Sequence, residues 1–495
     1  MKAWELDEIR RAVKGKWLMR PEQLRTFNGR ISTDSRKVGQ GELFIAIKGE
    51  RFDAHDFLAD IIGKEPAAIL VHREPAAELL ALAREKGVTI ILVDDTVGAL
   101  NRLAAAYRSN EIVPGFRAKV IAVGGSNGKT TTKRIIHSLL SEKFGAAGGH
   151  ASPKSFNNNI GMPLTLLEVA PSHEYVVLEI GTNAPGEIAA LGEVCRPDIA
   201  VITSVGLEHL EKLGDLAGVA REEASIAPFV ADGGTLIFPA ETPELLQSLK
   251  LANAQRILIA RDAAAAKEAD LSLTAVETSA AGTTFSINNR GSFTIPLIGE
   301  HNGFNALVGI AVARRLGVSD DQIAAGLLKV EPADGRFQLM HAGPYTVVND
   351  AYNANPTSME AALRTFAGLP APPKSRKVVV LADMRELGAA TDPMHRQIGE
   401  LVASLPFQVF IAIGESMKLA AEQLKLKNPK AKVVTYPSTP AARSELLKHL
   451  RKSDQILLKG SHSMNLESLL ELFRSEIPKP KVKFPAHKRV AAQRR

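Results

Sequence analysis

The stretch AKVIAVGGSNGKTT, residues 118–131, constrains the fold and the ligand of this chain more than any other. A short apolar run predicts a strand, glycines follow as a turn, and Gly128-Lys129-Thr130 opens a predicted helix. Glycines let backbone N–H groups close around phosphate oxygens, and the N-terminal end of a helix is positive. A lysine in this place reaches the β- and γ-phosphates, and the threonine after it binds Mg²⁺. The stretch therefore predicts a phosphate loop and a nucleoside triphosphate as its ligand.

The loop matches a shortened form of the P-loop pattern. The pattern G-x-x-x-x-G-K-[ST] requires glycine at position 123, where this chain has Val123, so the match begins at Gly124. A glycine-rich turn from strand to helix also fits such a pattern by chance, and the motif names no reaction. The predicted nucleotide contacts in the loop are Gly124, Gly125, Ser126, Asn127, Gly128, Lys129, Thr130 and Thr131.

Positive charge is concentrated at the C-terminal end. The sequence has 495 residues and a formal net charge of +7, and residues 479–495 hold seven Lys or Arg and no acid. The remaining 54 basic residues equal the 54 acidic ones, so the rest of the chain is formally neutral and indicates no nucleic-acid partner. The basic segment is either a solvated end or a weak electrostatic attachment to anionic lipid, where each basic residue contributes about 1 kcal/mol.

Bulk composition predicts a soluble protein. Apolar content of 45% and charged content of 23% are ordinary for globular domains. The first twenty residues carry charges throughout, and no run approaches the roughly 18 apolar residues of a membrane span. The only cysteine, Cys195, leaves no internal disulfide or cysteine-rich zinc site and suits a reducing compartment. We therefore expect a cytoplasmic protein. We also expect a monomer, an expectation that does not follow from the composition.

Predicted strands and helices alternate along most of the chain, which indicates α/β domains with mainly parallel sheets. Strand candidates at 41–49 and 88–95 belong to a small N-terminal domain, and apolar strands between 175 and 240 extend the phosphate-loop region into a P-loop ATPase-like domain. From 334 onward, five regular strand-helix units predict a Rossmann-like, doubly wound domain. The predicted boundaries are 1–115 (N-terminal), 116–333 (central), 334–478 (C-terminal) and 479–495 (basic tail).

Two side chains stand where magnesium bound to a nucleotide needs ligands. Glu179 and His209 each follow an apolar strand, and the carboxyl ends of strands are where such ligands face the loop. For an isolated Glu or His, a capping or solvated role is the commoner one, and that alternative stays open. Asn157, Asn158 and Asn159 form a run of amides that either contacts a ligand or builds a turn.

Several motifs together resemble those of the ATP-dependent Mur ligases of peptidoglycan synthesis. GGSNGKTT is similar to the family's phosphate loop, NNNIGMPLT to its Asn-Ile-Gly-x-Pro segment, and LEIG and GLEHLE to its metal-binding positions. HNGFNAL (301–307) is similar to its adenine-contacting motif and DGRF (334–337) to its Gly-Arg turn. These matches follow the family's order over most of three predicted domains.

Other segments resemble the family member that adds D-alanyl-D-alanine. They are DAYNANPTSM (350–359), LADMRELG (381–388) and KGSHSMNLE (459–467), and the N-terminal STDSRKVGQGELFIAIKG resembles a UDP-sugar-binding domain. The resemblance implies an ATP-dependent amide ligase that joins D-alanyl-D-alanine to UDP-N-acetylmuramoyl-tripeptide through an acyl phosphate. Two alternatives stay open: another Mur-type amino acid ligase, and a non-catalytic protein that binds ATP and cell-wall precursors.

The resemblance also implies roles for individual residues. Lys129 and two Mg²⁺ ions supply positive charge for phosphoryl transfer, with Thr130 and Glu179 on one ion and His209 on the other. Beyond the loop, the implied nucleotide contacts are Asn159, Asn302, Asn305, Arg336 and Asp350. The implied substrate contacts are Asp34, Ser35 and Arg36 at the UDP end and Asn353, Asn355 and Ser461 at the dipeptide.

The chain departs from the family pattern at three places. His55 stands in Asp-Ala-His where the family usually has Asp-Gly-His, and His462 stands where an arginine usually follows Lys-Gly-Ser. Where many members carry a carbamylated lysine, this chain has Glu223. A glutamate already carries the negative charge of a carbamate, so we expect Glu223 to serve the second Mg²⁺; the alternative is a solvated acid beside Glu222.

Overall fold

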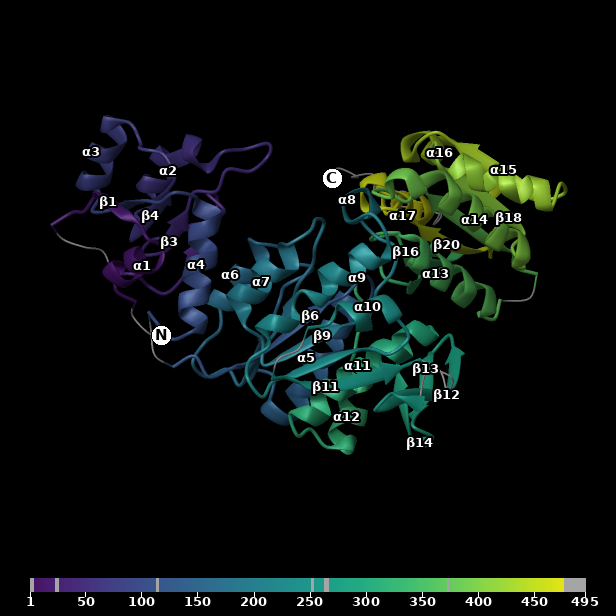
Figure 1. Cartoon of the computed structure of the whole chain (residues 1–495). Coiled ribbons are helices and arrows are strands. Elements are labelled where there is room, and N and C mark those ends of the chain that lie inside the picture. Colours follow the sequence, from purple (N-terminus) through teal and green to yellow (C-terminus); the bar gives the residue numbers. More distant parts are fainter. Residues whose placement is uncertain are drawn as a thin grey trace, which may run out of the picture. The chain divides into compact units, whose positions relative to one another are not determined.

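The computed structural model describes residues 4–22, 26–112, 115–250, 253–261, 267–371 and 374–475. They form two compact units, of which the first holds the chain up to Ala333 together with Asn355–Pro370 and Arg385–Thr391. Three β-sheets with covering helices confirm the predicted α/β class (Figure 1). In these residues no helix combines the length and the apolar character needed to cross a bilayer. The predicted basic tail, 479–495, lies outside them.

The N-terminal sheet has the strand order β1-β5-β4-β3-β2 and is parallel except for β1, which pairs antiparallel with β5. Strands β3 and β4 are buried along their whole length, as in a parallel sheet covered on both faces. The strands are β1 Lys16–Met19, β2 Ile31–Ser32, β3 Leu43–Ile45, β4 Ala68–Val71 and β5 Thr89–Leu92. The helices are α1 Leu6–Ala12, η1 Ala54–Phe57, α2 Leu58–Gly63, α3 Ala77–Glu85 and α4 Thr96–Arg108.

Helix α4 joins this sheet to the next one. Its N-terminus is capped by Asp95, whose carboxylate accepts hydrogen bonds from the N–H groups of the first turn. Near its C-terminus, the ring of Tyr107 packs against Trp4 and Phe116, with centroids 5.1 and 5.3 Å away. The apolar core around α4 runs on into the central sheet, so the first two sheets share one core within the first unit.

The central sheet has nine strands in the order β14-β13-β12-β11-β10-β9-β6-β8-β7. Strands β6 to β12 pair in parallel, as predicted, whereas β12, β13 and β14 pair antiparallel and were not predicted. The strands are β6 Lys119–Gly124, β7 Gly149–Ala151, β8 Tyr175–Glu179, β9 Ile199–Ile202, β10 Thr235–Pro239, β11 Gln255–Ala260, β12 Leu271–Ser279, β13 Gly282–Ile287 and β14 Arg290–Ile295.

Helix α5, which starts at the phosphate loop, packs closely against α11. Gly309 of α11 permits this approach, because a Cβ added there would lie 2.5 Å from Cγ2 of Ile135. The helices of this part are α5 Lys129–Phe144, α6 Gly161–Leu167, α7 Glu187–Cys195, α8 Leu210–Leu213, α9 Leu216–Ala224, η2 Ala227–Phe229, α10 Pro243–Ser248, α11 Glu300–Arg315 and α12 Asp320–Leu327. The first unit also includes α13 Pro356–Gly368 and η4 Gly388–Ala390.

The second unit is built on a six-stranded sheet with the order β15-β16-β20-β17-β18-β19. The strands of the five predicted strand-helix units are confirmed and pair in parallel. Each is followed by its predicted helix, but the first of these helices, α13, is grouped with the first unit. The antiparallel edge strand β15 was not predicted. The elements are β15 Gln338–Ala342, β16 Tyr345–Asp350, β17 Lys377–Ala382, β18 Val409–Ile413, β19 Lys432–Tyr436, β20 Gln455–Lys459, α14 Thr391–Ser404, α15 Met417–Lys427, α16 Thr439–Glu445, η5 Leu446–His449, η6 His462–Met464 and α17 Ser468–Ser475.

Cys195 is fully buried at the end of α7, and burial raises the pKa of its thiol to about 12. Because the thiolate is the nucleophile, we expect the folded protein to be inert to a disulfide reagent at pH 8. Addition of denaturant should expose one reactive thiol per chain, measured as the absorbance of the released thiolate. Reaction of native protein at the rate of the unfolded chain would contradict this burial.

Candidate active site

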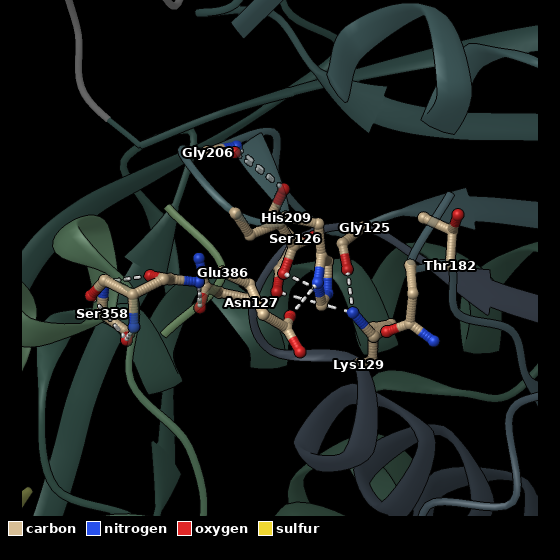
Figure 2. A network of polar contacts seen from close by, with 12 residues as sticks. Gly125, Ser126, Asn127, Lys129, Thr182, Gly206, His209, Ser358 and Glu386 are labelled. Atoms are coloured by element: carbon tan, nitrogen blue, oxygen red, sulfur yellow. Dashed lines mark hydrogen bonds and ion pairs between the residues drawn. The ribbon is translucent and has the colours of Figure 1, made fainter. Parts of the chain in front are cut away.

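The phosphate loop takes a backbone path that only glycine suits at two positions. Gly125 and Gly128 have φ of 111° and 87°, in the left-handed region. A Cβ added at Gly125 would lie 2.3 Å from Oγ1 of Thr203, and one at Gly128 would lie 2.4 Å from Oδ1 of Asn305. Nζ of Lys129 folds back over the loop and donates to the carbonyl oxygen of Gly125 at 2.5 Å (Figure 2).

Thr130 and Glu179 lie together beneath this loop, as the sequence predicted. Oγ1 of Thr130 donates to Oε2 of the fully buried Glu179 at 3.0 Å. Nζ of Lys133, one turn further along α5, donates to the same oxygen at 2.9 Å, and Nδ2 of Asn157 donates to Oε1 at 3.2 Å. A capping or solvated role for Glu179 is therefore wrong. Lys133 was missed, although its spacing of four residues from Lys129 places it on the same face of the helix.

The donor set around Thr130 fits a magnesium ion that arrives with a nucleotide. A hydroxyl and a carboxylate oxygen 3.0 Å apart are ligands that Mg²⁺ prefers. Among the described residues, no three His, Cys, Asp or Glu side chains converge to hold a metal on their own. Mg²⁺ is commonly bound by one or two protein groups together with substrate phosphates and water, so this sparse donor set is sufficient.

Two carboxylates lie near the ring of His209, and one of them, Glu386, is seen beside it in Figure 2. Its Nδ1 is 2.5 Å from Oε2 of Glu386, and its Nε2 is 3.9 Å from Oε2 of Glu208. Burial raises the pKa of the Glu208 carboxyl, while the charge of Lys129 acts in the opposite direction. Neither glutamate was predicted. Glu208 is signalled only by its place beside His209. Glu386 lies within the family-like segment 381–388, but nothing in the sequence pairs it with His209, which is 177 residues away.

Glu223 is buried against the phosphate loop. Its exposed fraction is 1%, and its Oε2 accepts a hydrogen bond from the N–H of Gly125 at 2.8 Å. Within the described part of the chain its Oε1 has no hydrogen-bond partner. Burial raises the pKa of Glu223 to about 8, against the opposing charge of Lys129. The alternative of a solvated acid is therefore wrong, and one carboxylate oxygen is left for a ligand.

The neighbouring Glu222 has a structural role and binds residues outside the phosphate loop. Its carboxylate accepts from Oγ1 of Thr182 and from the N–H groups of Gly186 and Ile188, at 3.2, 2.7 and 2.8 Å. These bonds fix the loop after Glu179 and the start of helix α7. Two successive acids on α9 therefore have separate roles, one in holding the fold and one at the phosphate loop.

The run of three asparagines makes hydrogen bonds within the protein, and a ligand contact by any of them stays a prediction. Asn157 binds Glu179, whereas Oδ1 of Asn158 accepts from the N–H groups of Ile160 and Gly161 and builds the start of α6. The side chain of Asn159 is exposed, and its carbonyl oxygen accepts from Nδ2 of Asn101 at 2.8 Å. A nucleotide contact by Asn159 stays a prediction.

One of the two predicted adenine-contacting residues, Asn305, lies against the phosphate loop, and the other, Asn302, is bonded to it. Nδ2 of Asn302 donates to the carbonyl oxygen of Ile298 at 2.9 Å, and Nδ2 of Asn305 donates to Oδ1 of Asn302 at 3.2 Å. Oδ1 of Asn305 in turn lies against Gly128. The structure thus brings two motifs together that are more than 170 positions apart in the chain, and their contact with adenine stays a prediction.

At the N-terminal domain, Asp34, Ser35 and Arg36 form a tight turn. The guanidinium of Arg36 donates two hydrogen bonds of 2.9 Å to Asp34 and lowers the pKa of its carboxyl to about 2. Nζ of Lys64 donates to the carbonyl oxygen of Ser35 at 2.6 Å. Binding of the UDP group here stays a prediction. His55, a departure from the family pattern, is buried and bonded to Asp53 at 2.7 Å.

In the second unit, Asp350 is half-buried and binds two buried neighbours, Phe337 and Lys459. Its Oδ1 accepts from the N–H of Phe337 at 3.0 Å, and its Oδ2 accepts from Nζ of Lys459 at 2.7 Å. Lys459 also donates to the carbonyl oxygen of Asn353 at 3.1 Å. Asp350 therefore fixes the turn that carries Arg336, in addition to any contact with nucleotide.

The other predicted residues of the C-terminal part separate into two groups. In the second unit, Arg336 stacks over the ring of Tyr352 at 4.2 Å, and His462 lies on the same ring at 5.6 Å. Ser461 is buried there near the carbonyl oxygen of Ala354. Asn355 belongs to the first unit, where its Nδ2 donates to Oδ1 of Asn127 in the phosphate loop at 3.0 Å.

We expect Asp350→Ala to destabilise the second unit by about 3 kcal/mol, because it leaves the buried Lys459 without its carboxylate. Denaturant unfolding measures this loss. The matched control is Asp320→Ala, which breaks an exposed pair with Arg314 and should cost less than about 1 kcal/mol. Equal losses in the two variants would contradict a structural role for Asp350.

Three domain families match the chain in order: "Mur ligase family, catalytic domain" over residues 29–108, "Mur ligase middle domain" over 123–313, and "Mur ligase, glutamate ligase domain" over 335–462. The UDP-N-acetylmuramoyl-tripeptide–D-alanyl-D-alanine ligase of Bacillus subtilis (strain 168) is 34% identical over 468 residues, covering 94% of this chain and 97% of that protein. The chain belongs to the Mur ligase family. It is thus an ATP-dependent ligase, as the motifs predicted.

Solved Mur ligase structures have the same fold over nearly the whole length. MurF from Acinetobacter baumannii matches with a TM-score of 0.83 and 30% identity, covering 96% of this chain and 99% of that one. MurF from Thermotoga maritima in complex with ADP matches with a TM-score of 0.75 and 25% identity, covering 90% and 97%. These matches confirm the predicted three-domain Mur ligase fold.

Proposed function

We propose that this Mur ligase joins D-alanyl-D-alanine to UDP-N-acetylmuramoyl-tripeptide and converts ATP to ADP and phosphate. The C-terminal carboxylate of the tripeptide attacks the γ-phosphorus and gives an acyl phosphate. The amine of D-alanyl-D-alanine then attacks the acyl carbon, and phosphate leaves from the tetrahedral intermediate. The near full-length similarity to ligases of this name supports the proposal.

The first step brings two anions together, so the site must concentrate positive charge. Lys129 sits at the end of the phosphate loop and supplies a protein cation for the γ-phosphate. The N–H groups of the loop and the start of α5 bind the phosphate oxygens. Asn302, Asn305 and Asn159 contact the nucleotide, together with Arg336 and Asp350.

Two Mg²⁺ ions complete the site in this proposal. Thr130 and Glu179 hold one ion, and His209 and Glu223 serve the other. When bound, the ions neutralise charge on the transferred phosphoryl group. One observation supports this division best: among the described residues, Oε1 of the buried Glu223 carboxyl has no hydrogen-bond partner. A cation bound there would satisfy this oxygen and favour the charged form of the carboxyl, which burial alone disfavours.

The remaining assignments extend the proposal along the chain. Asp34, Ser35 and Arg36 bind the UDP end, and Asn353, Asn355 and Ser461 bind the dipeptide. The domain boundaries are 1–115, 116–333 and 334–478. We further propose a cytoplasmic monomer whose segment 479–495 either is solvated or attaches weakly to anionic lipid, for which salt-sensitive vesicle binding is the test.

Oxygen transfer tests the proposed reaction. With both carboxylate oxygens of the tripeptide's C-terminus labelled with ¹⁸O, each phosphate released should carry one ¹⁸O, seen as an isotope shift in ³¹P NMR. The label should appear in phosphate only when D-alanyl-D-alanine is present. Release of unlabelled phosphate together with peptide product would overturn the acyl phosphate route.

A further inference from the structure

A carboxylate from the segment Arg385–Thr391 holds the ring of His209. Nδ1 of His209 lies 2.5 Å from Oε2 of Glu386, and the N–H of Glu211 donates to the carbonyl oxygen of Glu386 at 3.1 Å. Strand β17, before this segment, belongs to the second unit, but the segment itself belongs to the first, with His209. A side-chain contact and a backbone hydrogen bond therefore fix it to the start of α8.

The backbone at both ends of this contact is in a conformation that few side chains adopt. His209 has φ of 49° and Glu386 has φ of 65°, both in the left-handed region. Gly388, at φ of 54°, lies so close to α8 that an added Cβ would be 3.2 Å from Cα of Glu211. Strained residues of this kind persist where the surrounding structure fixes them, and they concentrate at functional sites. The backbone conformation on both sides therefore fixes this contact, unlike that of a chance pair on the surface.

Stability does not explain the contact. The Glu386 side chain is 56% exposed, and exposed ion pairs contribute little to folding. The contact has a larger effect on the protonation of the His209 ring than on folding stability. A carboxylate on Nδ1 keeps the ring proton on that nitrogen and leaves the lone pair of Nε2 for a metal. Nε2 faces the carboxyl group of Glu208. That carboxyl group in turn interacts with Ser126 and Lys129 of the phosphate loop.

We propose that Glu386 is a positioning residue for His209. It holds the imidazole in one orientation and one tautomer, with Nε2 available to a divalent cation beside the phosphate loop. The inference rests on the metal-binding role of His209 given above. It makes metal affinity depend on a segment that lies 177 positions further along the chain.

Mn²⁺ binding tests this inference without a turnover measurement. Free Mn²⁺ is measured by electron paramagnetic resonance with the full-length protein, a non-hydrolysable ATP analogue and UDP-N-acetylmuramoyl-tripeptide. Glu386→Ala should weaken Mn²⁺ binding about 10- to 100-fold. Glu386→Gln keeps an oxygen that accepts from Nδ1–H, so it should lose clearly less. Glu415→Ala, a matched control after β18 that loses only an exposed pair with Lys418, should bind like the wild type.

Parallel measurement of His209→Ala separates the two proposals. If His209→Ala binds Mn²⁺ as the wild type does, the metal-binding role of His209 is wrong and the positioning role falls with it. If His209→Ala weakens binding but Glu386→Ala does not, only the positioning role is overturned. A loss in Glu386→Gln as large as that in Glu386→Ala overturns it as well. Circular dichroism confirms that each variant is folded.

Discussion

Lys129→Ala should lower ligase turnover about 1000-fold while the protein stays folded. The ammonium group of Lys129 lies at the end of the phosphate loop and donates hydrogen bonds to carbonyl oxygens of that loop. Removing one preorganised charge partner of a developing transition state costs about 100- to 1000-fold. No apolar packing is lost from the core beneath α5, so the melting temperature should change little.

Turnover is measured as ADP release, with folding followed by circular dichroism. Lys143→Ala is the matched control, because Lys143 lies on the same helix and its Nζ donates to the carbonyl oxygens of Leu316 and Gly317. It should keep the wild-type rate. Near-native turnover in folded Lys129→Ala would remove Lys129 from the reaction.

Glu223→Gln should have effects of opposite sign on activity and on stability. Activity should fall about 100-fold or more, because the change removes the anion proposed to serve the second Mg²⁺. In the absence of nucleotide and metal the same change should stabilise the protein. Folding keeps the Glu223 carboxyl protonated up to a pKa of about 8, whereas the unfolded chain releases the proton near 4.5. The wild type therefore loses stability as pH rises from 4.5 to 8, and the amide does not.

Melting temperatures at pH 5 and pH 8.5, together with turnover at limiting Mg²⁺, measure both effects. The stabilising effect of Glu223→Gln should be larger at pH 8.5. Wild-type turnover should be indifferent to bicarbonate, and Glu223→Lys should regain some activity only when bicarbonate is supplied, since a carbamate forms from CO₂ and a neutral amine. A fully active Glu223→Gln enzyme at limiting Mg²⁺ would show that the carboxylate has no part in metal binding.

Local sequence signals predicted the residues whose chemistry is tied to a short motif. Gly125, Gly128, Lys129 and Thr130 follow from the phosphate loop, and the parallel strands follow from long apolar runs. The antiparallel strands β12 to β14 were missed because their buried and exposed positions alternate, so no long apolar run marks them. Their alternation is a signal that could have found them.

Residues whose role depends on tertiary contacts were beyond the sequence. Glu386 reaches His209 only through the fold, and Lys133 is a buried partner of Glu179 rather than a solvated helix lysine. Asp350 was predicted for the nucleotide, but its partners Lys459 and Phe337 became visible only in the structure. A family pattern gives the position of such a residue, whereas its hydrogen bonds show what its loss will cost.

Omission of one substrate at a time tests the central claim most directly. ADP release and the mass of the nucleotide-linked product are measured with ATP, UDP-N-acetylmuramoyl-tripeptide and D-alanyl-D-alanine. We predict stoichiometric ADP and a product heavier than the tripeptide substrate by one D-alanyl-D-alanine less one water, formed only when all three are present. Stoichiometric ADP without D-alanyl-D-alanine, or ligation of a different amino acid in its place, would contradict the account.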